Sequence, residues 1–194
     1  MLQLRNYERL AELLIGATDL ASLMQQHDPR FEDRVLDWFG TLANELKQNR
    51  LPEAARVSAH HLQLLAAKRA RTPEPGAAPR TRRARFLAQA SEAVQRTVEL
   101  VSASLAADRA SIGEVEGMAA SMAAAILNNG IKLTELGADH SERMLQLIAH
   151  LKRNASTKDA VIHLEGRVGA LDLMILMDRA LSRLERERKT RLEG

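Results

Sequence analysis

The segment FEDRVLDWFGTLANEL, residues 31–46, decides the fold class of this chain. Its apolar residues recur three or four positions apart, which places them on one face of an α-helix: Phe31, Val35, Trp38, Phe39, Leu42 and Leu46. Asp28 and Pro29 precede the segment and suit an N-cap and a first helical position. We therefore expect a helix that begins after Asp28, ends near Gln48 and forms the main core helix of its domain.

The rest of the chain repeats this pattern. Aromatic residues make up only 3% of the 194 residues, so the core must consist of Leu, Ala, Ile, Val and Met, which suit helices better than strands. Similar apolar stripes predict helices over residues 6–26, 52–70, 82–108, 111–128, 140–153 and 156–192. The sequence thus predicts an all-α protein of about seven helices, with an N-terminal three-helix body and a C-terminal four-helix bundle that has a long last helix.

The starts of three C-terminal helices carry capping signals, in which a side chain accepts a hydrogen bond from the backbone N–H three residues later. The pairs are Ser111 with Glu114, Asp139 with Glu142, and Ser156 with Asp159. The helix that begins at Ser111 has two apolar faces. One consists of large residues, and the other of small ones: Gly113, Gly117, Ser121, and Ala124 or Ala125. We expect the small face to pack against a neighbouring helix, as in the centre of a bundle.

Residues 71–83 separate the two bodies. They contain Pro73, Pro75, Gly76 and Pro79, which together cannot continue a helix. The predicted organisation is an N-terminal helical domain over residues 1–70, a Pro/Arg-rich basic linker over 71–83 and a C-terminal helical bundle over 84–194.

The positive charge of the chain is concentrated around this linker. Residues 68–85 carry seven basic side chains and one acidic side chain, whereas the segments before and after carry net charges of −2 and −1. Clustered arginines can contact phosphates, and the candidates are Arg80, Arg82, Arg83 and Arg85. Binding of nucleic acid would be independent of base sequence, because no aromatic side chain is interleaved for stacking. A solvated, flexible linker is the alternative interpretation.

Familiar catalytic motifs are absent from the sequence. It contains no G-x-G-x-x-G, G-K-[ST], G-x-S-x-G or H-E-x-x-H, no cysteine, and no pair of histidines at a spacing that chelates a metal on one helix. We therefore expect a protein that is not an enzyme and that has no metal and no cofactor.

One short pattern gives a third functional hypothesis. Arg56 and His61 form Arg-x-x-x-x-His, which resembles the motif of the all-helical HEPN-type ribonucleases. The resemblance implies that Arg56 and His61 converge on an RNA phosphate. Val57 departs from the motif, since a polar residue usually follows the arginine.

The last predicted helix provides a candidate partner surface. Its apolar residues follow three–four spacing: Leu171, Met174, Ile175, Met177, Leu181 and Leu184. Such a helix either faces its own core and ends in a solvated tail, or projects and pairs with another helix, as in a coiled coil. We expect a protein partner here and a homodimer through this helix.

Several general features place the chain in a broad class. The N-terminus lacks the basic start and apolar run of a signal peptide, and the nearly uncharged apolar runs are too short to cross a bilayer. We expect a cytoplasmic protein without a transmembrane segment, and the 22 Arg against 6 Lys suggest a GC-rich bacterial genome. The predicted function is that of a non-catalytic helical interaction protein (adaptor, chaperone-like factor or complex subunit). A nucleic-acid-associated accessory protein that acts through the basic linker is the alternative.

Overall fold

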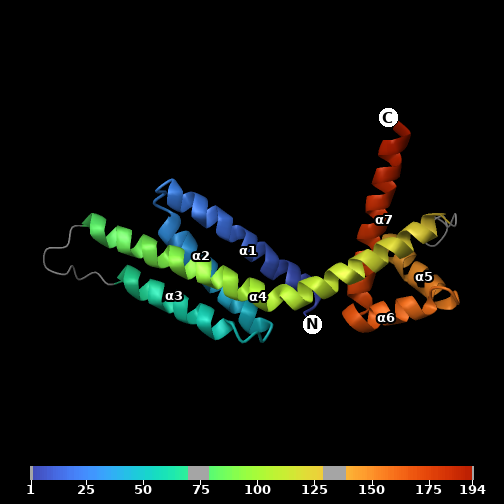
Figure 1. Cartoon of the computed structure of the whole chain (residues 1–194), viewed down its shortest axis with the longest axis horizontal. Helices are drawn as coiled ribbons and strands as arrows, with labels where there is room; N and C mark the ends of the chain where they lie inside the picture. The colour runs from blue at the N-terminus through green and yellow to red at the C-terminus, as the bar shows by residue number, and fades with distance from the viewer. Residues whose placement is uncertain (1, 70–78, 129–138, 194) are drawn as a thin grey trace. The chain divides into compact units, whose positions relative to one another are not determined.

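The computed structural model describes residues 2–69, 79–128 and 139–193, and all regular structure in these ranges is helical (Figure 1). The helices are α1 (Leu4–Gln25), α2 (Phe31–Gln48), α3 (Ala54–Arg69), α4 (Pro79–Asn128), α5 (His140–Arg153), α6 (Lys158–Val168) and α7 (Ala170–Glu193). The prediction of an all-α protein with about seven helices is confirmed for the described residues.

The helices form two compact units whose boundary lies inside α4. The N-terminal unit contains Leu2 and residues 6–106, and the C-terminal unit contains residues 3–5 and the described residues from Ala107 onward. The sequence places this boundary in the linker over residues 71–83. Residues 71–78 of that linker lie outside the described residues, and residues 79–83 form the start of α4.

The N-terminal unit has one core, to which α1, α2, α3 and the first half of α4 contribute. The apolar face of α2 lies at its centre, with Phe39, Leu42 and Leu46 fully buried. The α4 residues in the same cluster are Phe86, Ala90, Val101 and Leu105. Residues 84–106 therefore pack with the N-terminal helices, and not with the predicted 84–194 bundle, because their apolar side completes this core.

The predicted break between residues 108 and 111 is wrong, since α4 continues through it from Pro79 to Asn128. Ser111 and Glu114 do not cap a helix. Arg167 of α6 donates from Nη2 to Ser111 Oγ at 2.8 Å and to Glu114 Oε2 at 2.7 Å. The side-chain oxygens of Ser111 and Glu114, which could have capped a new helix, thus bind Arg167 instead. Ala106, Ala107 and Ala110 also favour continuation of the helix.

The single last helix predicted over residues 156–192 is also wrong. It is interrupted at Gly169, whose φ of 88° lies in a region that glycine adopts without steric cost. The N–H of Gly169 donates to the Glu165 carbonyl at 2.8 Å, so it closes α6, and α7 begins at the next residue. The capping prediction at Asp139 is confirmed, because its side chain accepts from the N–H of Glu142 at 2.7 Å.

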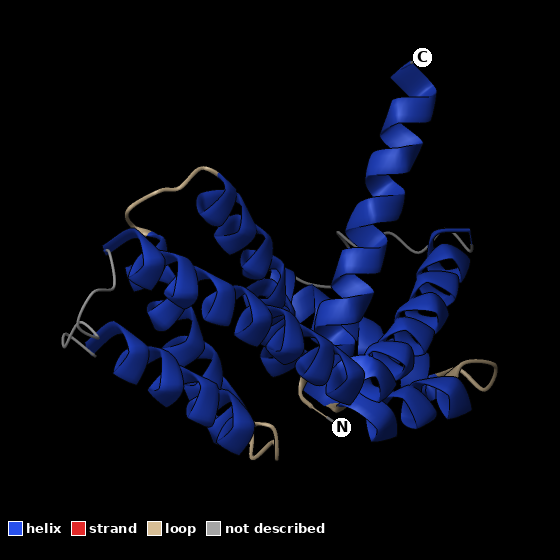
Figure 2. Ribbon diagram, turned by 60° about the vertical axis from the view of Figure 1, so that its left-hand side comes forward, coloured by secondary structure: helices blue, strands red, loops and turns tan. Residues whose placement is uncertain are grey.

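In the C-terminal unit, the second half of α4 lies with α5, α6 and α7. Helices α5, α6 and α7 pack on one another, and α4 contributes one buried face: Ile112, Val115, Ala119, Ala123 and Ile126. An ion pair between Lys152 and Glu165, at 2.6 Å, connects α5 to α6. The C-terminal part of α7 extends past α5 and α6 (Figure 2).

The first residues of the chain belong to the same unit. Leu4 is 2% exposed, and its backbone N–H donates to Asp172 Oδ2 at 2.8 Å. Leu4 is the first residue of α1, where a backbone N–H has no partner within the helix. The buried Asp172 carboxylate therefore caps α1 from the first turn of α7.

Candidate interaction surfaces

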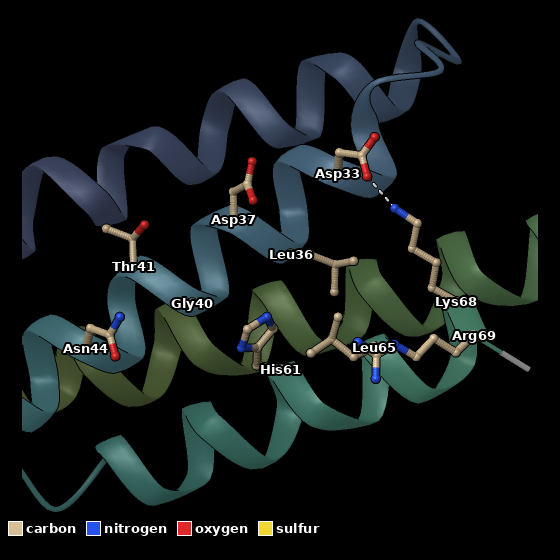
Figure 3. Close-up of a pocket in the computed structure, with 10 residues that line it drawn as sticks. All are labelled: Asp33, Leu36, Asp37, Gly40, Thr41, Asn44, His61, Leu65, Lys68 and Arg69. Atoms are coloured by element: carbon tan, nitrogen blue, oxygen red, sulfur yellow. Dashed lines mark hydrogen bonds and ion pairs between the residues drawn. The ribbon is translucent and has the colours of Figure 1, made fainter.

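A polar groove of about 880 Å³ lies between α2 and α3 (Figure 3). Its walls are formed by Asp33, Leu36, Asp37, Gly40, Thr41, Asn44, His61, Leu65, Lys68 and Arg69. The two helices run antiparallel, since Lys68 near the end of α3 ion-pairs with Asp33 near the start of α2. This pair closes one end of the groove.

Gly40 allows the two helices to approach each other in the middle of the groove. A Cβ atom at this position would lie 3.2 Å from Cε1 of His61, closer than ordinary van der Waals contact. His61 lies beside Gly40 between the helices, whereas the carboxylate of Asp37 points away from α3 (Figure 3). Asp37 and His61 therefore do not face each other across the groove, and its close acid–base contact is the Asp33–Lys68 ion pair at one end.

The histidines do not gather with other metal-ligating side chains in the part of the chain that the structure describes. No group of three or more His, Cys, Asp or Glu residues there could hold a metal ion. His60 is part of the packing: its Nδ1 lies 3.0 Å from the hydroxyl of buried Thr97, and its ring meets Phe39 edge-on. Arg56 is exposed and lies about 140° around α3 from His61, so the two residues of the ribonuclease-like pattern do not converge.

The basic cluster around the linker is partly engaged in contacts of the fold. Arg83 donates from Nη2 to the carbonyl oxygens of His27 and Asp28, at 3.0 and 3.4 Å, and so ties α4 to the turn between α1 and α2. Arg85 also has an interaction partner. The side chains of Arg80 and Arg82 lie outside the described residues. Thus neither described arginine of the predicted phosphate site is an unengaged cation.

The same turn contains a tight ion pair. Arg30 donates to Asp28 through both guanidinium and backbone, with Nη2 at 2.7 Å from Oδ2 and the backbone N at 2.8 Å from Oδ1. The side-chain hydrogen bond from Arg30 is the main cause that lowers the pKa of Asp28 from 3.8 to about 2. Asp28 is therefore ionised in nearly all conditions, and it orders the start of α2.

The predicted partner residues of α7 do not share one accessible surface. Met177 is 0% exposed and Leu181 is 2% exposed, so both belong to the core of the C-terminal unit. Leu171 is 69% exposed, and Met174, Ile175 and Leu184 are half-buried. The row of apolar residues expected from the sequence is therefore split: Met177 and Leu181 face the core, whereas Leu171 is exposed and Met174, Ile175 and Leu184 are partly accessible.

A longer exposed surface lies on the second half of α4. We call it the α4 outer face. Its small and apolar residues are Ala107, Ala110, Gly113, Gly117, Met118, Ser121 and Ala125, and Glu114 lies among them; all are exposed. These residues cover an arc of about 140° opposite the buried face. A Cβ atom added at Gly113 or at Gly117 would meet nothing within 4 Å. The prediction that the small-residue face packs against a neighbouring helix is therefore wrong for the described part of the chain.

This half of α4 is unusually apolar for a helix that is so little buried. The segment Arg83–Asn128 contains an 18-residue window of mean hydropathy 1.2, of which only 28% is buried. After Arg109, Glu114 and Glu116 are the only charged residues of the helix, so the window falls on its second half. By length and composition the helix meets a criterion for crossing a membrane, which core helices of soluble proteins also meet. The shorter apolar runs considered in the sequence did not show this.

Comparison with known proteins adds no relative. No protein-family model, no curated protein and no solved structure matches the chain.

Proposed function

We propose that the chain is a non-catalytic helical interaction protein, acting in the cytoplasm as an adaptor, chaperone-like factor or complex subunit. The observation that carries this proposal is the α4 outer face, a largely apolar helix surface that is exposed to solvent and contains one charged residue, Glu114. Contiguous exposed apolar surface mostly marks a place where another molecule binds. A helix face of this kind fits a helical partner that lies along it.

The α7 residues Leu171, Met174 and Ile175 are proposed as a second, smaller contact for a partner. A 69% exposed Leu171 gains contact area when it is covered, which contributes roughly 1.5–3 kcal/mol if its burial becomes complete. This surface is smaller than the one predicted from the sequence, because Met177 and Leu181 are already buried in the protomer.

The alternatives gain less support from the described residues. Binding of nucleic acid through the linker requires unengaged cations, and Arg83 is hydrogen-bonded to two carbonyl oxygens. The ribonuclease-like reading requires Arg56 and His61 on one surface, and they lie on different sides of α3.

The proposal is tested by affinity purification with three forms of the full chain. They are the wild type, the outer-face variant Ala110→Lys with Met118→Glu, and Leu62→Lys as a matched control. Leu62 is 65% exposed on α3, so its change introduces a charge at an apolar surface position of the other unit. We expect a protein that copurifies with the wild type and the control and that is lost with the outer-face variant. Equal recovery with all three forms contradicts the proposal.

A further inference from the structure

We propose that the α4 outer face binds a second copy of this chain, with the two α4 helices antiparallel and a two-fold axis passing between Ile112 and Gly113. This inference rests on the proposed function and names one partner of the same surface. It is carried by the charged residues that flank the face, and by the position of its one large apolar side chain.

The flanking charges complement each other across this axis. Arg109 and Glu116 are both exposed, and neither interacts with another described residue. They are seven residues apart, so they lie within about 20° of each other on one flank of the face. A two-fold axis midway between them places Arg109 of each copy opposite Glu116 of the other. Two equivalent ion pairs form, whereas a parallel pair in register would set like charges opposite each other.

The apolar side chains complement each other about the same axis. Met118 is 37% exposed, and it lies as far beyond the axis as Ala107 lies before it. In the antiparallel pair the Met118 side chain of one copy meets the small Ala107 of the other, so a large residue packs against a small one. Gly113 lies at the axis with open space around it, which allows the two backbones to approach closely.

Glu114 lies within the face itself, between Ser121 and Ala107 around the helix. Its carboxylate is paired with Arg167 of its own copy. The axis places Glu114 opposite Ser111 of the second copy, and Ser111 also accepts a hydrogen bond from its own Arg167. Residues 107–118 thus provide a self-complementary contact without unpaired like charges, as an isologous interface requires.

Charge reversal at the two exposed positions tests this arrangement with the full chain. Arg109→Glu gives a face with acidic residues at both positions, and Glu116→Arg gives one with basic residues at both. We expect each variant alone to weaken the dimer by roughly tenfold or more, because both ion pairs become repulsive. An equimolar mixture of the two variants should form a heterodimer, since each position then faces its opposite charge.

Sedimentation velocity at several concentrations provides the measurement, with circular dichroism to verify folding. A wild type that stays monomeric at high micromolar concentration overturns the inference, and so do single variants that dimerise as well as the wild type. Binding of monomeric wild type to phospholipid vesicles, lost in Met118→Glu, would assign the face to a membrane surface instead. The proposed function fails separately, when no copurifying protein depends on the outer face and the purified chain does not self-associate.

Discussion

The two halves of α4 carry different kinds of residue on the exposed side of one continuous helix. In the first half most outward residues are charged or polar, and some of them bind one another: Glu92 pairs with Arg96 at 2.6 Å, and Gln95 donates to Glu99 at 3.0 Å. In the second half most outward residues from Ala107 to Ala125 are small or apolar, and the charged ones are Arg109, Glu114 and Glu116. The inner sides of both halves are buried in ordinary apolar cores. The two halves thus differ on the outer side, and our proposal assigns a partner to the second half alone.

The largest expected effect separates the core side of α7 from its outer side. Leu181→Asp places a charge in a site that is 2% exposed, and it should destabilise the C-terminal unit by about 4 kcal/mol or more. Leu171→Asp is the matched control at a 69% exposed position and should change stability by less than about 0.5 kcal/mol. Urea denaturation followed by circular dichroism measures both. Equal losses would mean that α7 does not distinguish the two sides.

A second comparison concerns the two sides of α4 itself. Ile112→Ala removes a side chain that is 4% exposed and should lower the free energy of unfolding by about 2–5 kcal/mol. Met118→Ala, on the outer face, should lower it by less than about 1 kcal/mol in the monomer. The measurement is chemical denaturation at low protein concentration. A large loss for Met118→Ala under these conditions would place this residue in the protomer core.

Arg167→Ala tests why α4 is continuous. The change removes the hydrogen bonds that Arg167 donates to Ser111 and Glu114, and we expect a loss of about 1 kcal/mol. Arg153→Ala, at an exposed position without a partner among the described residues, is the control and should have no measurable effect. The measurement is the thermal midpoint of unfolding of the two variants. Equal midpoints would mean that the hydrogen bonds from Arg167 do not stabilise α4.

The smallest expected effect is the change in stability from Asp28. This residue lies in the turn between α1 and α2, to which Arg83 of α4 donates hydrogen bonds. An NMR titration should find the pKa of Asp28 at about 2, and Arg30→Ala should raise it toward 3.8. Because the pKa is lower in the folded state, the stabilisation is present above the unfolded pKa and is lost as the pH falls from about 4 toward 2. A pKa that stays near 3.8 in the wild type would contradict this ion pair.

The sequence predicts the helices better than their boundaries or neighbours. The stripe from Phe31 to Leu46 is buried as expected, because it has the helical period over several turns. The break at Ser111 was predicted in error, since a Ser–x–x–Glu pattern suits a cap and a helix interior equally. Gly169 was missed, because the apolar period continues on both sides of it. Local patterns cannot decide such cases, which depend on the partner of Ser111 and on one backbone angle.

The candidate surfaces were harder to predict than the helices. From their three–four spacing we expected Met177 and Leu181 to be accessible. A row of apolar residues along a helix does not reveal whether it faces the core or the solvent. The same limit applies to Gly113 and Gly117, whose small side suggested a packed neighbour. Gly40 in α2 could have indicated that another helix approaches closely at this position. In the structure that helix is α3, whose His61 lies beside Gly40.

Disulfide trapping tests the antiparallel pairing of the α4 outer face most directly, because the native chain contains no cysteine. Gly113→Cys places a thiol beside the proposed two-fold axis, within reach of the same residue in the second copy. Ala125→Cys places it on the same face, but about 37 Å from its counterpart in an antiparallel pair. Under mild oxidation we expect Gly113→Cys to form a covalent dimer and Ala125→Cys to remain monomeric on a non-reducing gel. Efficient cross-linking of both variants would indicate a parallel pair, and cross-linking of neither would contradict the contact.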